Sequence, residues 1–271
     1  MTPARRRSHA VLLMVVAGIV ILAGGGTVLL LNGKPSAAPR ASVAAARATP
    51  AAVEGAERIR VPVSDQVPPR LPASGVPRGW QLKEFAGQAA VELVRTDGRL
   101  AVRLRSDRAS FALHRDVVVD LKEFPFLTWS WKVSRLPAAG DVRDHARDDE
   151  AAQIYVVFPR WPSPRTTSEV IGYVWDSRAP VGTRLRHPRA PNVHIIVVES
   201  GPGRLDGWLR YERNVAADYA AIFGHPPPRV GKVALMTDSN DTRSEAEALI
   251  GDIFFSRTSA GRAEIPSIVL R

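Results

Sequence analysis

Residues 124–158 constrain the fold of this chain more than any other stretch. The first part reads FPFLTWSWKV, in which apolar and polar residues alternate with the period of an extended strand. The alternation places four side chains on one face, namely Leu127, Trp129, Trp131 and Val133. The segment ends in AAQIYVVF, whose β-branched and aromatic residues favour a second strand. We therefore expect two strands joined by a loop rich in Asp and Arg, and this loop is the first place to look for a functional site.

Strand patterns continue on both sides of this segment. AVELVRTDGRLAVRL has the pattern of a hairpin that turns at Asp97-Gly98, a pair that tolerates positive φ angles. EVIGYVW, VHIIVVES and WLRYERNV have the composition of further strands. Many short strands with few helices predict a mainly β fold, a jelly-roll-like antiparallel β-sandwich with one or two short helices.

One helix is predicted in the folded region, over residues 215–223. Asn214 can cap its first turn, and Gly224 followed by prolines ends it. The last segment is expected to hold a strand, a polar loop with one helical turn at residues 244–248, and a closing strand that ends at Phe255.

The amino terminus differs from the rest of the chain. Three arginines precede an apolar run without a charge, which is long enough to cross a bilayer as a helix of ~20 residues. Cleaved signal peptides usually have a shorter apolar core of ~7–15 residues, although a long signal cut near AAARA remains the alternative. We expect a single-pass inner-membrane protein with a periplasmic domain, or a secreted one after cleavage. The expected parts are a basic cytoplasmic tail (1–9), a transmembrane anchor or uncleaved signal (10–31), an Ala/Pro/Arg-rich tether (32–58), the β-sandwich (59–258) and a C-terminal tail (259–271).

Charge and cysteine content exclude several classes of function. The net charge is +10, but the first 60 residues hold eight basic and two acidic residues and so account for +6 of it. The remaining arginines alternate with acidic residues, as on a solvated surface, so we expect no nucleic-acid partner. The absence of cysteine excludes disulfides, thiolate metal ligands and a cysteine nucleophile.

Several blocks of sequence occur in an order that resembles a known family. These are GW…F at 79–85, FPFLTWSWKV, DDEAAQIYVVF, GYVW, RNVAADYAAIFG before the prolines, and LMTDSNDT…GDIFFS. Together they resemble the DUF3047 family of exported bacterial proteins, a domain of unknown function, over about 80–255. The resemblance implies a sandwich similar to carbohydrate-binding jelly rolls, with no activity to carry over. Asp148 and Asp149 fit the family's acidic loop, whereas the late loop, DSNDT, departs from its usual pattern.

Aromatic residues are the first group of candidate ligand contacts. The apolar face of a sugar stacks on an aromatic ring, so a row of exposed rings would form a platform. The candidate rings are Trp129, Trp131, Tyr155, Tyr173 and Trp175. The alternative for the tryptophan pair is the core, because rings aligned with aliphatic residues usually fill an interior.

Two acidic clusters are the second group of candidates. Asp148 and Asp149 precede the strand AAQIYVVF, and Asp238, Asn240 and Asp241 lie in the late loop. Calcium suits such oxygen ligands, so a structural calcium ion is possible at either cluster, and no other cofactor is expected. The alternatives are salt bridges with nearby arginines at 143, 147 or 243, or a role for the aspartates in forming turns.

These patterns support three hypotheses of function. The first is a membrane-anchored periplasmic sandwich that binds a carbohydrate or another cell-envelope ligand without catalysis. The second is a polysaccharide hydrolase in which Asp149 acts with Asp241 or Glu169, because glycoside hydrolysis uses two carboxylates. The third is a structural protein-interaction module. The sequence leaves the oligomeric state open.

Overall fold

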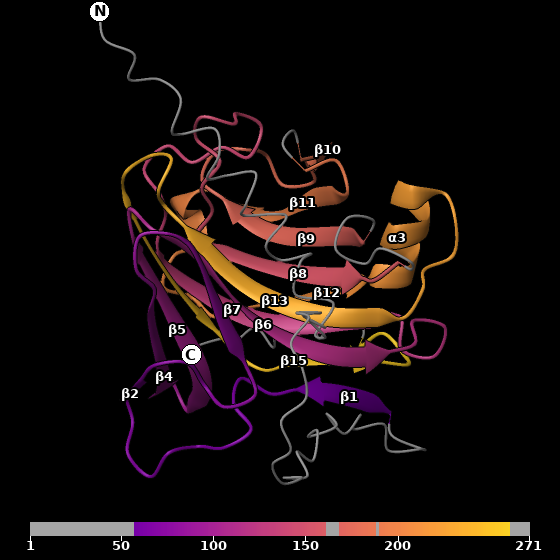
Figure 1. Ribbon diagram of the computed structural model, residues 1–271, viewed down its shortest axis with the longest axis horizontal. Coiled ribbons are helices and arrows are strands. Elements are labelled where there is room, and N and C mark those ends of the chain that lie inside the picture. Colours follow the sequence, from indigo (N-terminus) through magenta and orange to yellow (C-terminus); the bar gives the residue numbers. More distant parts are fainter. Residues whose placement is uncertain (1–56, 161–167, 188–189, 261–271) are drawn as a thin grey trace, which may run out of the picture.

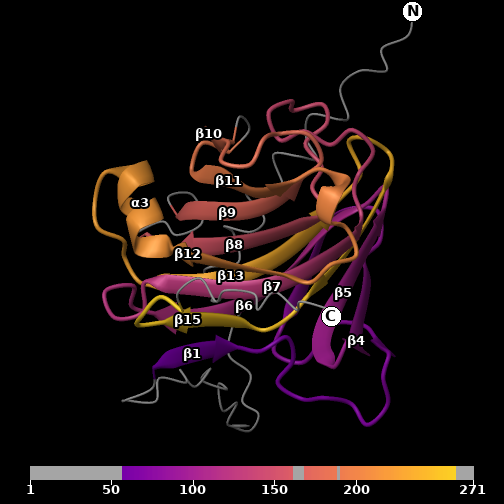
Figure 2. The same cartoon turned by 180° about the vertical axis from the view of Figure 1, so that it is seen from behind.

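The computed structural model describes residues 57–160, 168–187 and 190–260. This part of the chain forms two curled β-sheets that pack face to face, which confirms the prediction of a mainly β sandwich (Figure 1, and from behind in Figure 2). The predicted basic tail, anchor and most of the tether lie outside the described residues. No helix within the described part has the length and apolar character needed to cross a membrane.

The first sheet follows the order β1-β15-β7-β14-β5-β4-β2, and β12 pairs with β7 beside this path. Its strands are β1 (Arg58–Val61), β2 (Ala73–Ser74), β4 (Ala90–Thr96), β5 (Arg99–Asp107), β7 (Phe126–Arg135), β12 (Leu209–Asn214), β14 (Glu245–Ile250) and β15 (Ile253–Ser256). All pairings in this sheet are antiparallel. β14 and β15 both pair with β7. The second edge of β14 pairs with β5, and the second edge of β15 pairs with β1, so the two strands diverge.

The second sheet follows the order β10-β11-β9-β8-β13-β6-β3. Its strands are β3 (Gln81–Ala86), β6 (Ser110–Val119), β8 (Ala152–Phe158), β9 (Glu169–Asp176), β10 (Arg184–Arg186), β11 (Val193–Ser200) and β13 (Val230–Asp238). β9 and β11 run parallel, and the other pairings in this sheet are antiparallel. A short 3₁₀ helix, η1 (Pro202–Arg204), and the helix α3 (Val215–Phe223) complete the described elements. α3 lies at one end of the sandwich (Figure 1).

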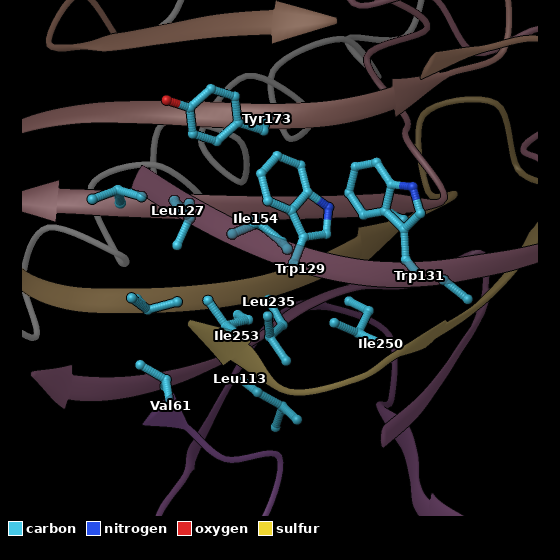
Figure 3. Close-up of a cluster of buried hydrophobic side chains, with 14 of the residues drawn as sticks. Val61, Leu113, Leu127, Trp129, Trp131, Ile154, Tyr173, Leu235, Ile250 and Ile253 are labelled. Carbon is cyan, nitrogen blue, oxygen red and sulfur yellow. The ribbon is translucent and has the colours of Figure 1, made fainter. Parts of the chain in front are cut away.

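β7 supplies the centre of the core between the sheets. Its inward residues alternate as the sequence predicts, and Trp129 and Trp131 are at most 1% exposed. The two indoles lie 5.5 Å apart edge to face, a favourable arrangement for aromatic pairs. The ring centroid of Tyr173, from the facing sheet, lies 5.4 Å from that of Trp129 (Figure 3). The ring of Tyr211, from β12, lies 5.6 Å from that of Trp129. The tryptophan pair therefore fills the core, which was the alternative to an exposed platform.

The second sheet is covered on both faces. The side chains of β8 that point away from the main core join a second apolar cluster with residues of β9, β11 and β13. Val142, Ala179 and Ala190 belong to this cluster although they lie in loops. Burial on both sides explains why β8 reads as a continuous apolar run and not as an alternating one.

Two local predictions are confirmed. β4 and β5 form the expected hairpin, and Asp97 and Gly98 have φ angles of 50° and 72° at its turn. The helix α3 begins after Asn214, whose side chain accepts a hydrogen bond from the backbone N–H of Ala217, and ends at Gly224 with a φ of 75°. Both boundaries follow from local chemistry, so the sequence alone could place them.

One other expectation is wrong. Residues 244–248 do not form a helical turn, because β14 runs from Glu245 to Ile250 and pairs with both β5 and β7.

Asp218 of α3 is a buried charge, with an exposure of 5%. Its carboxylate accepts hydrogen bonds from Arg213 and from the hydroxyl of Tyr173, which satisfies the buried charge.

Replacing Trp131 by Ala should lower the free energy of unfolding by ~3–5 kcal/mol, because it leaves a cavity among rings from both sheets. Trp131→Phe keeps an aromatic ring at that place and should cost clearly less. Urea denaturation measures both changes. Val118→Ala, at a β6 residue that is 56% exposed, should stay within about 0.5 kcal/mol of the unchanged protein. A Trp131→Ala variant as stable as Val118→Ala would contradict this assignment of the core.

Candidate functional site

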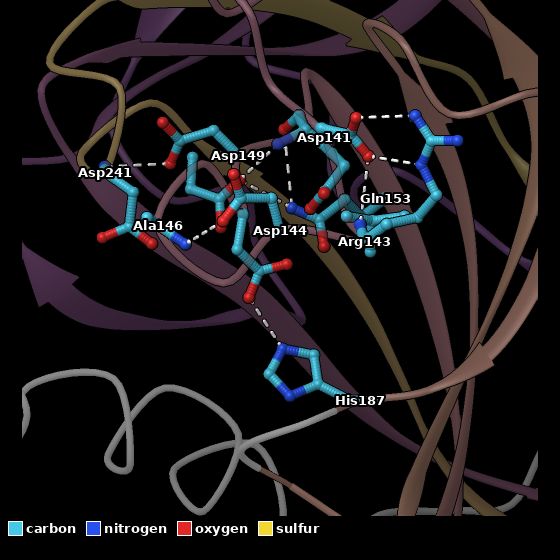
Figure 4. A network of polar contacts seen from close by, with 12 residues as sticks. Asp141, Arg143, Asp144, Ala146, Asp149, Gln153, His187 and Asp241 are labelled. Atoms are coloured by element: carbon cyan, nitrogen blue, oxygen red, sulfur yellow. Dashed lines mark hydrogen bonds and ion pairs between the residues drawn. The ribbon is translucent and has the colours of Figure 1, made fainter.

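The two acidic loops predicted from distant parts of the chain meet in the structure. The carboxylate of Asp149 accepts hydrogen bonds from the backbone N–H groups of Asp241 (3.1 Å) and Thr242 (2.6 Å). The backbone N–H of Glu150 donates to Asp238 at 2.7 Å. Figure 4 shows this network around Asp149, Gln153 and Asp241. The aspartates therefore join the loop before β8 to the loop after β13.

These contacts use the carboxylates of Asp149 and Asp238, whereas Asp241 contributes its backbone N–H. Within the described ranges, no group of three or more His, Cys, Asp or Glu side chains is arranged to hold a metal ion. Asn240 is not one of these residue types, so the calcium site expected at Asp238, Asn240 and Asp241 stays a prediction. The arginines of the loop pair with other partners than expected, since Arg143 binds Asp141 and Arg147 binds Asp144.

The two remaining carboxylates of interest have partners elsewhere. Asp148 lies 2.9 Å from the ring nitrogen Nε2 of His187, and both side chains are almost fully buried. Glu169, the alternative second carboxylate of a hydrolase, binds Arg160 at 2.8 Å and accepts a hydrogen bond from the hydroxyl of Tyr219. These pairs hold loops and strands together, so the geometry gives no observation in favour of a catalytic pair.

Glu150 is the least satisfied member of the acidic network. It is 3% exposed, and its Oε1 has no hydrogen-bond partner among the described residues. Burial, and then the neighbouring charge of Asp238, raise the pKa of Glu150 well above its ordinary value. Burial also raises the pKa of Asp238, but Asp238 accepts two N–H donors, from the Glu150 backbone and from Gln153. Since these donors favour the ionised form, Glu150 is the member of the pair that holds the proton.

The predicted aromatic candidates do not form a surface platform. Trp129, Trp131, Tyr173 and Trp175 lie in the core between the sheets, at 0–1% exposure. Tyr155 points to the opposite side of the second sheet, is buried in the cluster covered by loops, and donates its hydroxyl to Gln153. None of these five rings has a face that a sugar could reach in this structure.

An accessible groove lies instead on the outer face of the first sheet. Directly opposed residues of antiparallel strands point to the same side, so the registers place its lining residues together. Thr128 is opposite Phe254, and Ser130 is opposite Arg210. Arg58 is opposite Ser256. These residues share the face of β7 that Trp129 and Trp131 do not use, and they line a groove of about 470 Å³.

Trp208 lies at one end of this groove. It precedes β12 and packs on an apolar cluster of Val94, Ala101 and Leu249 on the outer face of the sheet. Its indole N–H donates to Asp97 at 2.9 Å, and the Arg99 guanidinium lies 5.3 Å from the ring centroid. The ring is therefore fixed in position while it remains partly exposed.

Phe254 provides a second ring within the groove. The guanidinium of Arg58 lies 4.7 Å from its centroid. Beside it, at the point where β14 and β15 diverge, Asp252 accepts hydrogen bonds from Arg60 (2.7 Å) and from the Val63 backbone (2.8 Å). The groove thus combines two partly exposed rings, several hydroxyl groups and cationic side chains on a sheet whose strands fix their spacing.

Comparison with known families agrees with the order of the sequence blocks. The model of the family described as "Protein of unknown function (DUF3047)" matches residues 78–254. The chain belongs to the DUF3047 family. The matched stretch of this DUF3047 protein includes Arg99, Trp208 and Phe254 of the groove, whereas Arg58 precedes it. A comparison with curated proteins gave no match.

Solved structures that resemble this DUF3047 protein include carbohydrate-binding modules. One is the family 11 module of the cellulosomal cellulase Lic26A-Cel5E of Clostridium thermocellum, with a TM-score of 0.40 and 6% identity over 74% of this chain and 95% of that one. A second is a mutant of the module CBM29-2, with a TM-score of 0.34 and 11% identity over 78% of this chain and 99% of that one. A third is the K2 adhesin domain of Lys-gingipain, with a TM-score of 0.35 and 9% identity over 73% and 99%. These likenesses concern the outline of the fold.

The groove of the DUF3047 protein was not predicted from the sequence, although part of its signal was present. In WLRYERN, Trp208 and Arg210 alternate with Leu209 and Tyr211, so an aromatic residue shares a face with charged ones. This pattern marks an outward-facing tryptophan. The groove also contains residues from β1, β5 and β15. Strand pairing between segments more than a hundred residues apart brings them together, and no local sequence pattern predicts such pairing.

Glu150→Gln should stabilise the protein at neutral and alkaline pH. Because the native state holds the Glu150 proton more tightly than the unfolded state does, the unchanged protein loses stability as the pH rises above the unfolded pKa of about 4.3. The variant has no proton to lose there. We expect it to be more stable by roughly 1–3 kcal/mol at about pH 8, with the gain disappearing toward about pH 4. Thermal or urea unfolding across this range measures the difference.

Glu123→Gln is the control for this prediction. Glu123 is an exposed carboxylate that pairs with Arg257 at the surface, so its replacement should give no comparable gain at any pH. A Glu150→Gln variant whose stability differs from the unchanged protein by the same amount at both ends of the range would contradict the assignment of a buried proton to Glu150.

Proposed function

We propose that this DUF3047 protein is an exported, membrane-anchored β-sandwich of jelly-roll type that binds a carbohydrate or another cell-envelope ligand without catalysis. The proposed binding site is the groove on the outer face of the first sheet. The observation that carries the proposal is the presence of Trp208 and Phe254 with the hydroxyl group of Ser130 in one groove. The buried rings and the acidic loops serve the fold in this proposal.

The chemistry of the groove suits a sugar. A pyranose has one largely apolar face, which stacks on an indole, and a rim of hydroxyl groups that donate and accept hydrogen bonds. The hydroxyl group of Ser130 lies on the groove face and has no hydrogen bond with another described residue, so it can serve a ligand in both roles. Because Trp208 is held by Asp97 and by its apolar support, binding does not have to order it first.

The proposed location of the binding domain is the cell envelope. The apolar run over residues 10–31 would hold the chain in the inner membrane, and the tether over 32–58 would separate the sandwich from the bilayer. Glu57 and Arg58, the last residues of this tether, line the groove. A binding domain placed in this way would reach polymers of the envelope.

Trp208→Ala should weaken binding of the glycan recognised by the protein by at least about tenfold, or about 1.4 kcal/mol, because it removes the stacking surface. Phe254→Ala should act in the same direction. A glycan array of cell-envelope polysaccharides followed by calorimetry measures the loss. Val118→Ala, outside the groove, is the matched control, and thermal melting shows that each variant is folded. A folded protein that binds none of the polysaccharides would refute the proposed function.

Removal of residues 1–31 should leave the protein in the cytoplasm, because the arginines and the apolar run direct export. Fractionation of cells that express the complete chain should recover it with the inner membrane, and a protease added to the periplasm should degrade its folded domain. Recovery of the complete chain from the cytoplasm would show that residues 10–31 do not act as an anchor or a signal.

A further inference from the structure

The groove is lined by more arginine side chains than its carboxylates can neutralise. Arg58, Arg99 and Arg210 line it, and none of their guanidinium groups has a hydrogen bond or ion pair with another described residue. Of the two acidic residues in the lining, Asp252 is already bound by Arg60. Three arginines therefore face two carboxylates, namely Glu57 in the lining and Glu212, which accepts hydrogen bonds from the lining residues Thr128 and Ala260. An anionic ligand would complete this charge distribution.

Two of the three guanidinium groups are already positioned. Arg58 lies over the ring of Phe254, and Arg99 lies over the ring of Trp208. A cation–π contact of this kind holds the planar group while its N–H edge stays available for a ligand. Because these side chains lose less conformational freedom on binding, each contact with an anion is stronger than one from a mobile arginine.

The positions of the arginines indicate a polymer and not a single sugar. Arg58 is on β1 and Arg210 is on β12, and β15 and β7 lie between these strands. Three strand spacings correspond to ~14 Å across the sheet. The free hydroxyl group of Ser130 belongs to β7, between the two arginines, whereas that of Thr128 is buried and donates to Glu212. This arrangement alternates cationic and hydroxyl contacts over a distance longer than one monosaccharide.

We infer that the ligand is an acidic polysaccharide whose uronate carboxylates bind Arg58, Arg99 and Arg210 while its sugar rings contact Trp208 and the hydroxyl group of Ser130. This inference rests on the proposed function and adds the class of glycan. Carboxylates fit the two parallel N–H bonds that a guanidinium group offers. Phosphate and sulfate groups also bind arginine, so the test must separate them from uronate.

Polygalacturonate and its methyl ester provide the test, because esterification removes the charge and keeps the sugar backbone. The unchanged protein should bind the acid form at least about tenfold more tightly than the ester, and added salt should reduce this difference. The triple variant Arg58→Gln, Arg99→Gln, Arg210→Gln should bind both forms equally. Trp208→Ala should weaken both. Alginate serves as a second uronate polymer.

Arg178→Gln is the matched control, since Arg178 is an exposed arginine in a loop of the other sheet and should not affect binding. Equal binding of acid and ester by the unchanged protein would overturn the inference and leave the proposed function intact. Displacement of polygalacturonate by polyphosphate or dextran sulfate at equal charge concentration would show that the groove selects anions in general, and would overturn uronate recognition. Failure to bind any acidic or neutral glycan would overturn the proposed function as well.

Discussion

The two faces of β7 determine both the stability of this protein and the position of its groove. The strand has a period of two residues, so the tryptophans at 129 and 131 point into the core while Thr128 and Ser130 point outward. A shift of register by one residue would expose the indoles and bury the hydroxyl groups, which would cost both packing and hydrogen bonds. The pairing of β7 with β12, β14 and β15 is therefore fixed by the core, and the outward side chains of those strands are held in place as a consequence.

The sandwich is asymmetric, and the asymmetry decides which face can meet a ligand. The second sheet is covered on its outer side by loops that contribute Val142, Ala179 and Ala190 to an apolar cluster. The first sheet has an outer face with arginine, serine and threonine side chains and the partly exposed Trp208. The acidic loops belong to the covered side, where Asp148 contacts His187 and Asp149 binds backbone N–H groups. Their carboxylates hold loops on the second sheet. Glu150 is the exception, because burial raises its pKa and keeps it protonated.

Prediction from sequence succeeded where the signal was local and failed where it depended on packing. The hairpin at Asp97-Gly98 and the caps of α3 follow from the conformations that these residues favour, so they were placed correctly. Residues 244–248 were expected to form a helical turn, but residues 245–250 form β14 and pair with β5 and β7, so tertiary contacts override a weak local preference. The meeting of Asp149 with Asp241 was anticipated as a possibility. The role of Asp149 as an acceptor for backbone N–H groups required the structure.

The sequence by itself determined that the chain folds as a mainly β sandwich, that Leu127, Trp129, Trp131 and Val133 share a face, and that it resembles the DUF3047 family. These conclusions rest on periodicity and on the order of sequence blocks, which are properties of the chain in one dimension. The tertiary structure decided which aromatic residues are accessible and that Arg58, Arg99 and Arg210 line the same groove as Trp208. The physical reason is that a groove across a sheet is formed by residues from several strands, and the pairing of those strands is set by the packing of the whole core.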